Sequence, residues 1–168
     1  DWVAPDVVWT ESFDDLVDSP VDVVVELIGG LSPAREWIER ALMAGKSVVT
    51  ANKQVIAHAG AQLMTQAGQQ GRHLLFEAAV AGGIPIVRAL REGVCGDRLY
   101  RIQGVLNGTC NYILTEMEHE QVSFAEALAD AQRLGYAEAD PTADIDGFDA
   151  QAKLAILIAV GLGRIVRV

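Results

Sequence analysis

Three short apolar runs occupy the first half of the chain. They span residues 21–30, 47–51 and 74–79. Runs of this length that end in glycine or in small and polar residues predict strands. The unbroken apolar character of residues 23–25 further predicts that the first strand is buried on both faces.

Helical periodicity fills the intervals between these runs. One predicted helix has Ser32 as its N-cap and Pro33 in its first position, and it ends at Gly45. A second spans residues 55–70, and a short helix is expected around residues 14–17. Strands that alternate with helices in this way are typical of a parallel α/β sheet.

The pattern changes after Gly83. Ser123 and Glu126 have the spacing of a capping box at the start of a helix. Asn107-Gly108-Thr109 opens another helix, where an anion site and simple N-capping are equally good explanations. The predicted elements are a helix at 84–92, a strand at 99–106, helices at 107–117 and 124–134, and a helix from Phe148 onward.

The segment from Gly135 to Lys153 concentrates negative charge before a mostly apolar helix. Asp149 and Lys153 lie four residues apart, on one face of that helix. The simpler interpretation is a solvated ion pair that contributes little to stability. The alternative is a lysine at the mouth of a buried helix that acts as a general acid beside a carboxylate. Five acids precede the lysine: Glu138, Asp140, Asp144, Asp146 and Asp149.

Parallel sheets bind ligands beyond the carboxyl ends of their strands. Lys53 directly follows the second predicted strand, which favours a ligand contact over a solvated lysine at the start of a helix. Glu77 ends an apolar run, where a lone acid is costly unless it is paired or bound to a cation. The Ala81-Gly82-Gly83 turn would bring carbonyl oxygens close to it, so a hard cation and a simple hinge both remain open.

Composition narrows the classes of partner. The 168 residues carry a formal net charge of −10, which disfavours nucleic-acid binding. No basic run, leader or apolar stretch of spanning length indicates a membrane. Two cysteines, Cys95 and Cys110, do not make a disulfide framework, so a cytoplasmic setting is expected.

Five ordered blocks then resemble the homoserine dehydrogenase family. They cover most of residues 21–161 and match the family in order and separation. The blocks are V-V-V-E-L-I-G-G (23–30), V-V-T-A-N-K (48–53), F-E-A-A-V-A-G-G-I-P-I (76–86), L-N-G-T-C-N-Y-I-L (106–114) and the acidic segment G-Y-A-E-A-D-P…D-I-D-G-F-D-A-Q-A-K (135–153).

The resemblance implies an α/β fold in which a partial Rossmann-like parallel sheet precedes part of an α+β substrate and dimerisation domain. Residues 1–80 would be the remainder of the dinucleotide-binding domain, and residues 81–168 part of the substrate-binding and catalytic domain. No G-x-G-x-x-G sequence is present. We therefore expect the chain to be the middle of a longer protein and to bind dinucleotides weakly by itself.

The resemblance also implies a reaction and its residues. The family interconverts L-homoserine and L-aspartate 4-semialdehyde with NADP or NAD, in threonine and methionine biosynthesis, usually as a homodimer. Lys153 matches the proton donor, Asp149 lies beside it, and Lys53 lies between cofactor and substrate. The substrate-binding positions are Glu138, Asp144, Tyr136 and Thr109. The cofactor-binding positions are Thr50, Lys53 and Gly108. The positions of a monovalent-cation site, expected to take sodium, are Glu77, Val80, Gly82 and Ile84.

Two other functions compete with that of a catalytic core of such an enzyme. The first is a non-catalytic scaffold or dimerisation fragment of the same family, and the second is a cysteine-dependent enzyme. A cysteine-dependent semialdehyde dehydrogenase is disfavoured, because neither Cys95 nor Cys110 has a base nearby in the sequence. Cys110 stands where the family commonly has a small hydroxyl residue, which we interpret as a packing substitution.

Overall fold

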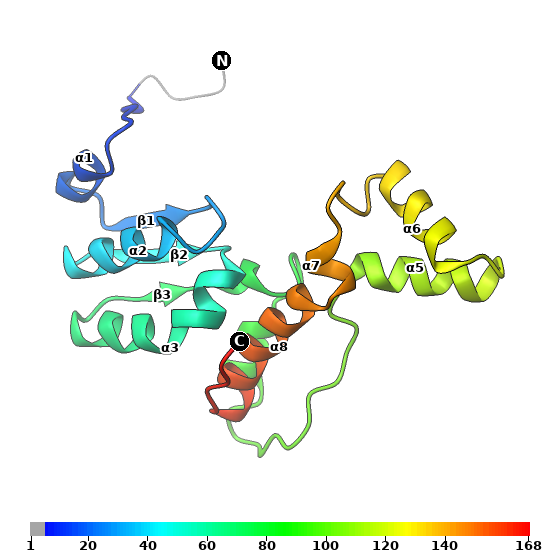
Figure 1. Ribbon diagram of the computed structural model, residues 1–168. Coiled ribbons are helices and arrows are strands. Elements are labelled where there is room, and N and C mark those ends of the chain that lie inside the picture. The colour runs from blue at the N-terminus through cyan, green and yellow to red at the C-terminus, as the bar shows by residue number, and fades with distance from the viewer. Residues whose placement is uncertain (1–5) are drawn as a thin grey trace. The chain divides into compact units, whose positions relative to one another are not determined.

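The computed structural model describes residues 6–168 and divides into two compact units, Asp1–Phe76 and Glu77–Val168 (Figure 1). Residues 1–5, which open the predicted 1–80 domain, lie outside the described residues. The division falls close to the boundary expected from the sequence, and the functions assigned to the two halves stay predictions.

The first unit is a parallel three-stranded sheet in the order β1-β2-β3. Val24 lies opposite Val48, and Val48 lies opposite Leu74. The predicted parallel α/β architecture is therefore confirmed. Its elements are α1 (Phe13–Asp18), β1 (Val23–Glu26), α2 (Ala34–Met43), β2 (Ser47–Thr50), α3 (Lys53–Gln69) and β3 (Leu74–Leu75).

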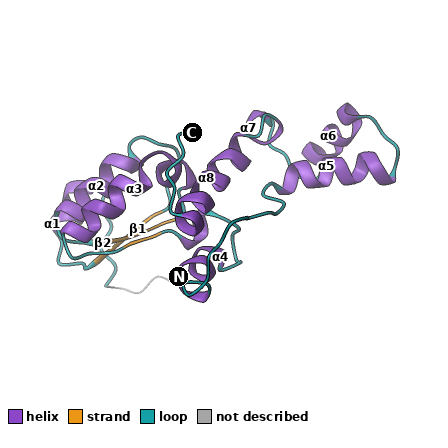
Figure 2. Cartoon of the chain, turned by 90° about the horizontal axis from the view of Figure 1, so that it is seen from below, coloured by secondary structure: helices purple, strands orange, loops and turns teal. Residues whose placement is uncertain are grey.

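Helices α2 and α3 lie on one face of this sheet (Figure 2). Strand side chains alternate between the two faces, so Val24 is buried while Val23 and Val25 are 50% and 60% exposed. The prediction that β1 is buried on both faces is wrong. An apolar run alone does not say whether helices cover one face or two. The covered face meets a core that includes Ile38, Leu42, Leu63 and Phe76.

Several boundaries in this unit differ from the sequence prediction, and the strand predicted at 21–30 spans only Val23–Glu26. Ser32 does not cap α2; Pro33 holds that position, and the first turn closes through the backbone, with Arg35 N donating to Leu31 O at 2.9 Å. The strand predicted at 74–79 ends at Leu75 and is followed by a short 3₁₀ helix, η1 (Glu77–Ala79). Helix α3 begins two residues earlier than predicted, so Lys53 is its first residue.

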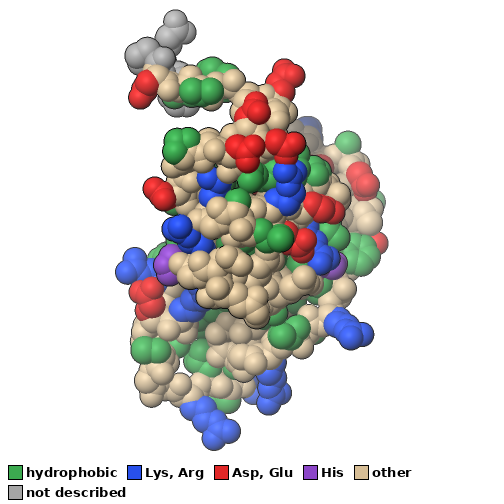
Figure 3. Space-filling view, turned by 90° about the vertical axis from the view of Figure 1, so that its left-hand side faces the viewer, with side chains coloured by type: hydrophobic (Ala, Val, Ile, Leu, Met, Phe, Trp, Pro, Cys, Tyr) green, Lys and Arg blue, Asp and Glu red, His purple; other side chains and the backbone are tan. Residues whose placement is uncertain are grey.

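Helix α1, predicted around residues 14–17, is confirmed. The Ser12 side chain caps it by accepting from Asp15 N, and the Phe13 ring stacks on Trp37 with centroids 4.7 Å apart. Acidic side chains lie near the upper end of the face seen in Figure 3. Helix α1 carries Asp14, Asp15 and Asp18.

The second unit is helical in its described residues. Its elements are η1, α4 (Ile86–Arg88), the π-helical turn η2 (Ala89–Gly93), α5 (Gly108–His119), α6 (Phe124–Arg133), α7 (Thr142–Ile145) and α8 (Phe148–Leu162). The single helix predicted at 84–92 is thus divided between α4 and η2.

The strand predicted at 99–106 is wrong. These residues run without regular structure, and Tyr100 and Val105 are 91% and 75% exposed. An alternating pattern makes a strand only where a neighbouring strand supplies hydrogen bonds. No strand is assigned among the described residues of this unit to act as a partner.

Helices α5 and α6 form a hairpin (Figure 1) with a small core of its own. Ile113 packs there against Ala127, Ala131 and Ala137. Helix α8 packs on α4 and η2, and Gly161 lies near Leu90 of η2. A Cβ at that position would lie 2.9 Å from Ile102 Cδ1.

The predicted capping box at the start of α6 is confirmed. Ser123 Oγ donates to Glu126 Oε2 at 2.7 Å, and Ser123 N donates to the same oxygen at 2.8 Å. In return, Glu126 N donates to Ser123 Oγ at 3.3 Å. The Ser123 hydroxyl and amide together hold the pKa of Glu126 below its usual value.

Loss of this N-cap in Ser123→Ala should cost about 1 kcal/mol of unfolding free energy at neutral pH. The folded-state pKa of Glu126 is the depressed one. Its contribution is therefore complete above the unfolded-state pKa and is lost as the pH falls through the folded-state value. Urea titrations at pH 7 and pH 3 should show the difference between wild type and variant narrowing in acid. Thr115→Ala, which removes a hydroxyl bonded to Asn111 O, is the control with no acid partner. A pH-independent difference for Ser123→Ala would contradict this account.

Candidate active site

The first turns of α8 carry an ion pair that is largely withdrawn from water. Lys153 Nζ lies 2.6 Å from Asp149 Oδ2, and the two side chains are 21% and 5% exposed. The interpretation of a solvated surface pair therefore does not fit the structure. The catalytic role of Lys153 stays a prediction.

Two further residues complete what we call the lysine–carboxylate cluster: Asn107, Asp144, Asp149 and Lys153. The Asn107 Nδ2 group donates to Asp144 Oδ1 at 2.7 Å and to Asp149 Oδ2 at 3.0 Å. Lys153 Nζ also donates to the backbone oxygen of Leu106 at 2.9 Å. The cluster thus joins α8 to α7 and to the start of α5.

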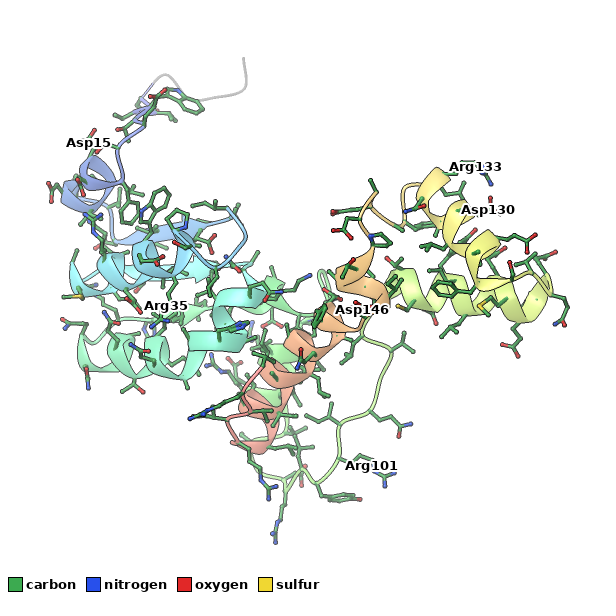
Figure 4. All side chains as sticks on the ribbon, viewed as in Figure 1. Asp15, Arg35, Arg101, Asp130, Arg133 and Asp146 are labelled. Atoms are coloured by element: carbon green, nitrogen blue, oxygen red, sulfur yellow. The ribbon has the colours of Figure 1, made fainter. Side chains whose placement is uncertain are left out.

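Asp144 reaches this cluster because the acidic segment contains a helix that the sequence did not predict. Helix α7 forms one turn between Pro141 and Gly147, two residues of types that ordinarily interrupt regular structure. Asp140 Oδ1 accepts from Thr142 N at 3.1 Å and from Thr142 Oγ1 at 2.6 Å just before that turn, and these bonds hold the pKa of Asp140 below its usual value. The remaining acid between the helices, Asp146, follows α7 directly (Figure 4).

Cys110 contacts the cluster but is poorly suited to nucleophilic chemistry. Its thiol donates to Asp144 O at 3.2 Å. Burial, and then the negative charges of Asp144 and Asp149, raise the pKa of the Cys110 thiol. Because the thiolate is the reactive form, this environment disfavours a cysteine-dependent mechanism.

The predicted substrate-binding residues Thr109 and Tyr136 are linked to each other. Thr109 Oγ1 donates to Tyr136 O at 2.8 Å, which ties the start of α5 to the acidic segment. The Tyr136 ring lies against Tyr112 with centroids 4.7 Å apart. Glu138 has an exposed side chain, and its backbone oxygen accepts from Gln132 at 3.1 Å. Their contact with substrate stays a prediction.

Gly108 is the first residue of α5 and is exposed. The two explanations for this helix start can now be compared. Asn107 Oδ1 accepts from Cys110 N at 2.8 Å, so Asn107 is the N-cap of α5. Thr109 donates its hydroxyl proton to Tyr136 O instead of capping the helix. A contact between Gly108 and a cofactor stays a prediction.

The carboxyl ends of β1 and β2 hold a second cluster, the strand-end network of Glu26, Thr50 and Asn52. All three residues are buried. The carboxylate of Glu26 accepts from the N–H groups of Ile28 (2.8 Å) and Gly29 (3.3 Å). Its other oxygen accepts from Thr50 Oγ1 at 2.5 Å.

Asn52 completes the strand-end network from the other side. Its amide Nδ2 donates to Gly30 O at 2.7 Å, and its N–H donates to Thr50 Oγ1 at 2.9 Å. The loop that follows β1 is thereby held near its start by Glu26 of β1 and at Gly30 by Asn52, the N-cap of α3. Gly29 and Gly30 have φ values of 82° and 69°, and nothing lies within 4 Å of a Cβ built on either. The result is an open backbone loop at the sheet edge where α/β proteins bind nucleotides.

Of the residues predicted from the sequence for this edge, Thr50 lies inside the network. Lys53 is the first residue of α3 and is partly exposed. Glu26 was missed, and Asn52 was given no role of its own although it lies in the V-V-T-A-N-K block. A signal was present for Glu26, since an acid within a strand predicted to be buried needs partners, but the partners themselves are not visible in a sequence.

Glu77 caps a helix with its side chain. The carboxylate accepts from Val87 N at 2.8 Å and from Arg88 N at 2.9 Å, at the start of α4. Ala81 and Gly82 follow with φ values of 63° and 53°. Within residues 6–168, no group of three or more His, Cys, Asp or Glu side chains is arranged to hold a metal ion. Capping of α4 is thus enough to explain the position of Glu77 without a cation, and the cation site stays a prediction.

None of the helices described here is both long enough and apolar enough to cross a membrane.

A parallel α/β unit with an open glycine loop at its strand ends, followed by a helical unit with a lysine–carboxylate cluster, places the chain among the α/β proteins that bind ligands beyond the carboxyl ends of their strands. Comparison with known protein families narrows this class to one family. The chain belongs to the homoserine dehydrogenase family: the model of the homoserine dehydrogenase NAD binding domain matches residues 2–77, and the homoserine dehydrogenase model matches residues 85–168.

Comparison with individual relatives supports the same family assignment. The homoserine dehydrogenase of Synechocystis sp. is 49% identical over 163 residues, which is 97% of this chain and 38% of the relative. That of Bacillus subtilis is 47% identical over 156 residues, covering 93% of this chain and 36% of the relative. The chain thus spans little more than a third of the length of these curated relatives.

Solved structures show the same fold. A homoserine dehydrogenase from Thiobacillus denitrificans has a TM-score of 0.89 and 53% identity, covering 92% of this chain and 36% of that one. A hyperthermophilic archaeal homoserine dehydrogenase in complex with NADPH has a TM-score of 0.86 and 36% identity, covering 96% of this chain and 50% of that one.

Proposed function

We propose that this chain supplies the catalytic residues of an NADP- or NAD-dependent homoserine dehydrogenase, which interconverts L-homoserine and L-aspartate 4-semialdehyde. The observation that carries the proposal is the ion pair between partly exposed Lys153 and buried Asp149, in the segment that the homoserine dehydrogenase model matches.

Lys153 would be the proton donor when the aldehyde is reduced. An ammonium group has three N–H donors, and the structure gives contacts to Asp149 and to Leu106 O. A third N–H can therefore be offered to a substrate oxygen. When bound, the nicotinamide supplies the hydride chemistry. As negative charge develops on the aldehyde oxygen, the adjacent ammonium stabilises it and transfers one proton, leaving an alcohol and a neutral lysine that solvent reprotonates.

The acidic segment would hold the amino end of the substrate. An ammonium group on the substrate is matched by carboxylates, and charge-assisted hydrogen bonds to carboxylates are the stronger kind. Asp144 and Glu138 are the acids assigned to this role, with Tyr136 and Thr109 beside them. The bond from Thr109 to Tyr136 O supports this grouping, because it joins the two segments that would contact substrate.

We propose Thr50 and Lys53, at the carboxyl end of β2, as cofactor-binding residues of the first unit, and Gly108 as a cofactor-binding residue of the second. The residues of the first unit fit this role, because the Gly29-Gly30 loop is open and the strand-end network fixes it. Backbone loops of this kind accept the close approach of a dinucleotide.

A monovalent cation such as sodium is proposed at Glu77, Val80, Gly82 and Ile84. A carboxylate has about four acceptor positions, and the two backbone N–H groups leave some of them for a hard cation. Activity in sodium chloride compared with choline chloride tests this element by itself, and equal rates would remove it.

A non-catalytic dimerisation fragment is the second candidate. It is supported by the exposed apolar side chains Val23, Val25 and Leu75 on one face of the sheet. In either case we propose a homodimer in the cytoplasm, which light scattering and cell fractionation test.

The direct test is an assay of the longest natural polypeptide that contains these 168 residues. Homoserine-dependent reduction of NADP or NAD is expected, together with the reverse reaction from the semialdehyde. A folded protein that binds neither dinucleotide in calorimetry and reduces neither would favour the dimerisation fragment.

A further inference from the structure

The side chain of Asn107 connects three helices of the second unit. Through Oδ1 it caps α5, accepting from Cys110 N at 2.8 Å. Through Nδ2 it donates to Asp144 on α7 at 2.7 Å and to Asp149 on α8 at 3.0 Å. Each donor hydrogen and the acceptor oxygen of one amide thus has a partner on a different helix.

The bonds to the two carboxylates oppose a repulsion. Two acids that meet one amide nitrogen repel each other when both are ionised, and the effect is larger where water is excluded. Asn107 is 8% exposed and Asp149 is 4% exposed. An amide nitrogen offers two donor hydrogens without adding charge, so it brings the acids together and leaves the positive charge to Lys153.

The neighbouring residue acts on the same lysine. Leu106 O accepts from Lys153 Nζ at 2.9 Å. The segment 106–107 therefore fixes both members of the ion pair: a carbonyl oxygen holds the ammonium and an amide holds its carboxylate. Movement of this segment would shift the lysine and its carboxylate together.

We propose that Asn107 is a positioning residue, whose amide holds Asp144 and Asp149 in place so that Asp149 orients Lys153 toward the substrate oxygen. The inference rests on the proposed function of Lys153. Asn107 is not expected to exchange a proton with substrate.

A competing explanation is that Asn107 is only the N-cap of α5. Serine is also a good N-cap, but its hydroxyl is too short to replace both donor bonds of the amide. Asn107→Ser therefore keeps the cap and removes the link to the carboxylates. Asn107→Asp also keeps the cap but puts a third carboxylate beside the other two. Ser123→Ala is the control, because it removes an N-cap of the same unit away from the cluster.

In the longest natural polypeptide containing this chain, Asn107→Ser should lower kcat about 10- to 100-fold, the loss expected for hydrogen bonds to charged groups. The KM for the dinucleotide should change by less than about twofold, and the solvent deuterium isotope effect on kcat should rise, because proton transfer becomes slower. Asn107→Asp should lose more activity than Asn107→Ser. Ser123→Ala should keep kcat within about twofold of wild type.

A second readout needs no activity. Competitive acetylation, resolved by mass spectrometry, measures how accessible the Lys153 amine is. Its labelling rate should rise several-fold in Asn107→Ser and stay unchanged in Ser123→Ala. Unchanged Lys153 labelling, or a kcat for Asn107→Ser within twofold of wild type, would reduce Asn107 to a helix cap. If the wild-type protein has no homoserine activity but Lys153 is still labelled faster in Asn107→Ser, the positioning role of Asn107 is retained and the proposed reaction is rejected.

Discussion

Replacing Lys153 with alanine is expected to lower kcat for homoserine oxidation by about 10²–10⁴-fold, the range for loss of a positioned general acid or base. The fold should remain, because Lys153 is partly exposed and water can reach the position left by its amine. We expect a loss of about 1–3 kcal/mol in unfolding free energy, since Asp149 loses a charged partner. Steady-state kinetics and urea unfolding measure the two effects.

The matched control is Arg133→Ala. It also removes the cation of a helical ion pair, with Arg133 Nη2 2.9 Å from Asp130 Oδ1 (Figure 4). That pair is 67% and 52% exposed, so the loss should stay below about 0.5 kcal/mol and turnover should not change. If Lys153→Ala kept more than about a tenth of wild-type turnover, Lys153 would not be the proton donor.

Replacing Glu26 with alanine should have the largest effect on the first unit. The change leaves the N–H groups of Ile28 and Gly29 and the hydroxyl of Thr50 without their acceptor. We expect a loss of about 2–3 kcal/mol in unfolding free energy. Dinucleotide affinity should fall at least about tenfold, because the glycine loop is no longer held.

Glu26→Gln is the control for this change. Its amide oxygen can still accept the two loop N–H groups, and its NH₂ can donate to the Thr50 oxygen. It should therefore stay within about 1 kcal/mol of wild type and keep most of the dinucleotide affinity. Urea unfolding and calorimetry would contradict the network's role if the two variants behaved alike.

Local patterns explain why much of the fold was predictable. The parallel α/β order follows from alternating apolar runs and helical periodicity, and the α6 capping box from two residues three apart. The number of sheet faces covered by helices was not predictable. The sequence of β1 is apolar at Val23, Val24 and Val25, but helices cover only one face of the strand. The extended segment 99–106 has a strand-like pattern, but no described residues of its unit form the neighbouring strand.

The candidate site was predictable where it depends on short spacing. The pair of Asp149 and Lys153 is an i,i+4 contact, and the sequence identified it. The bonds from Asn107 to Asp144 and Asp149 span 37 and 42 residues, and the bond from Thr50 to Glu26 spans 24. Such bonds depend on how helices and strands pack, which the periodicity of one segment does not specify.

The most direct measurement is a crystal structure of the longest natural polypeptide containing this chain, with dinucleotide and L-homoserine bound. The account predicts Lys153 Nζ at a hydrogen-bonding distance of about 3 Å from the homoserine hydroxyl oxygen, with Asp149 and Leu106 O still in contact with the same amine. A homoserine hydroxyl bound elsewhere, with the Lys153 amine directed into bulk water, would contradict it.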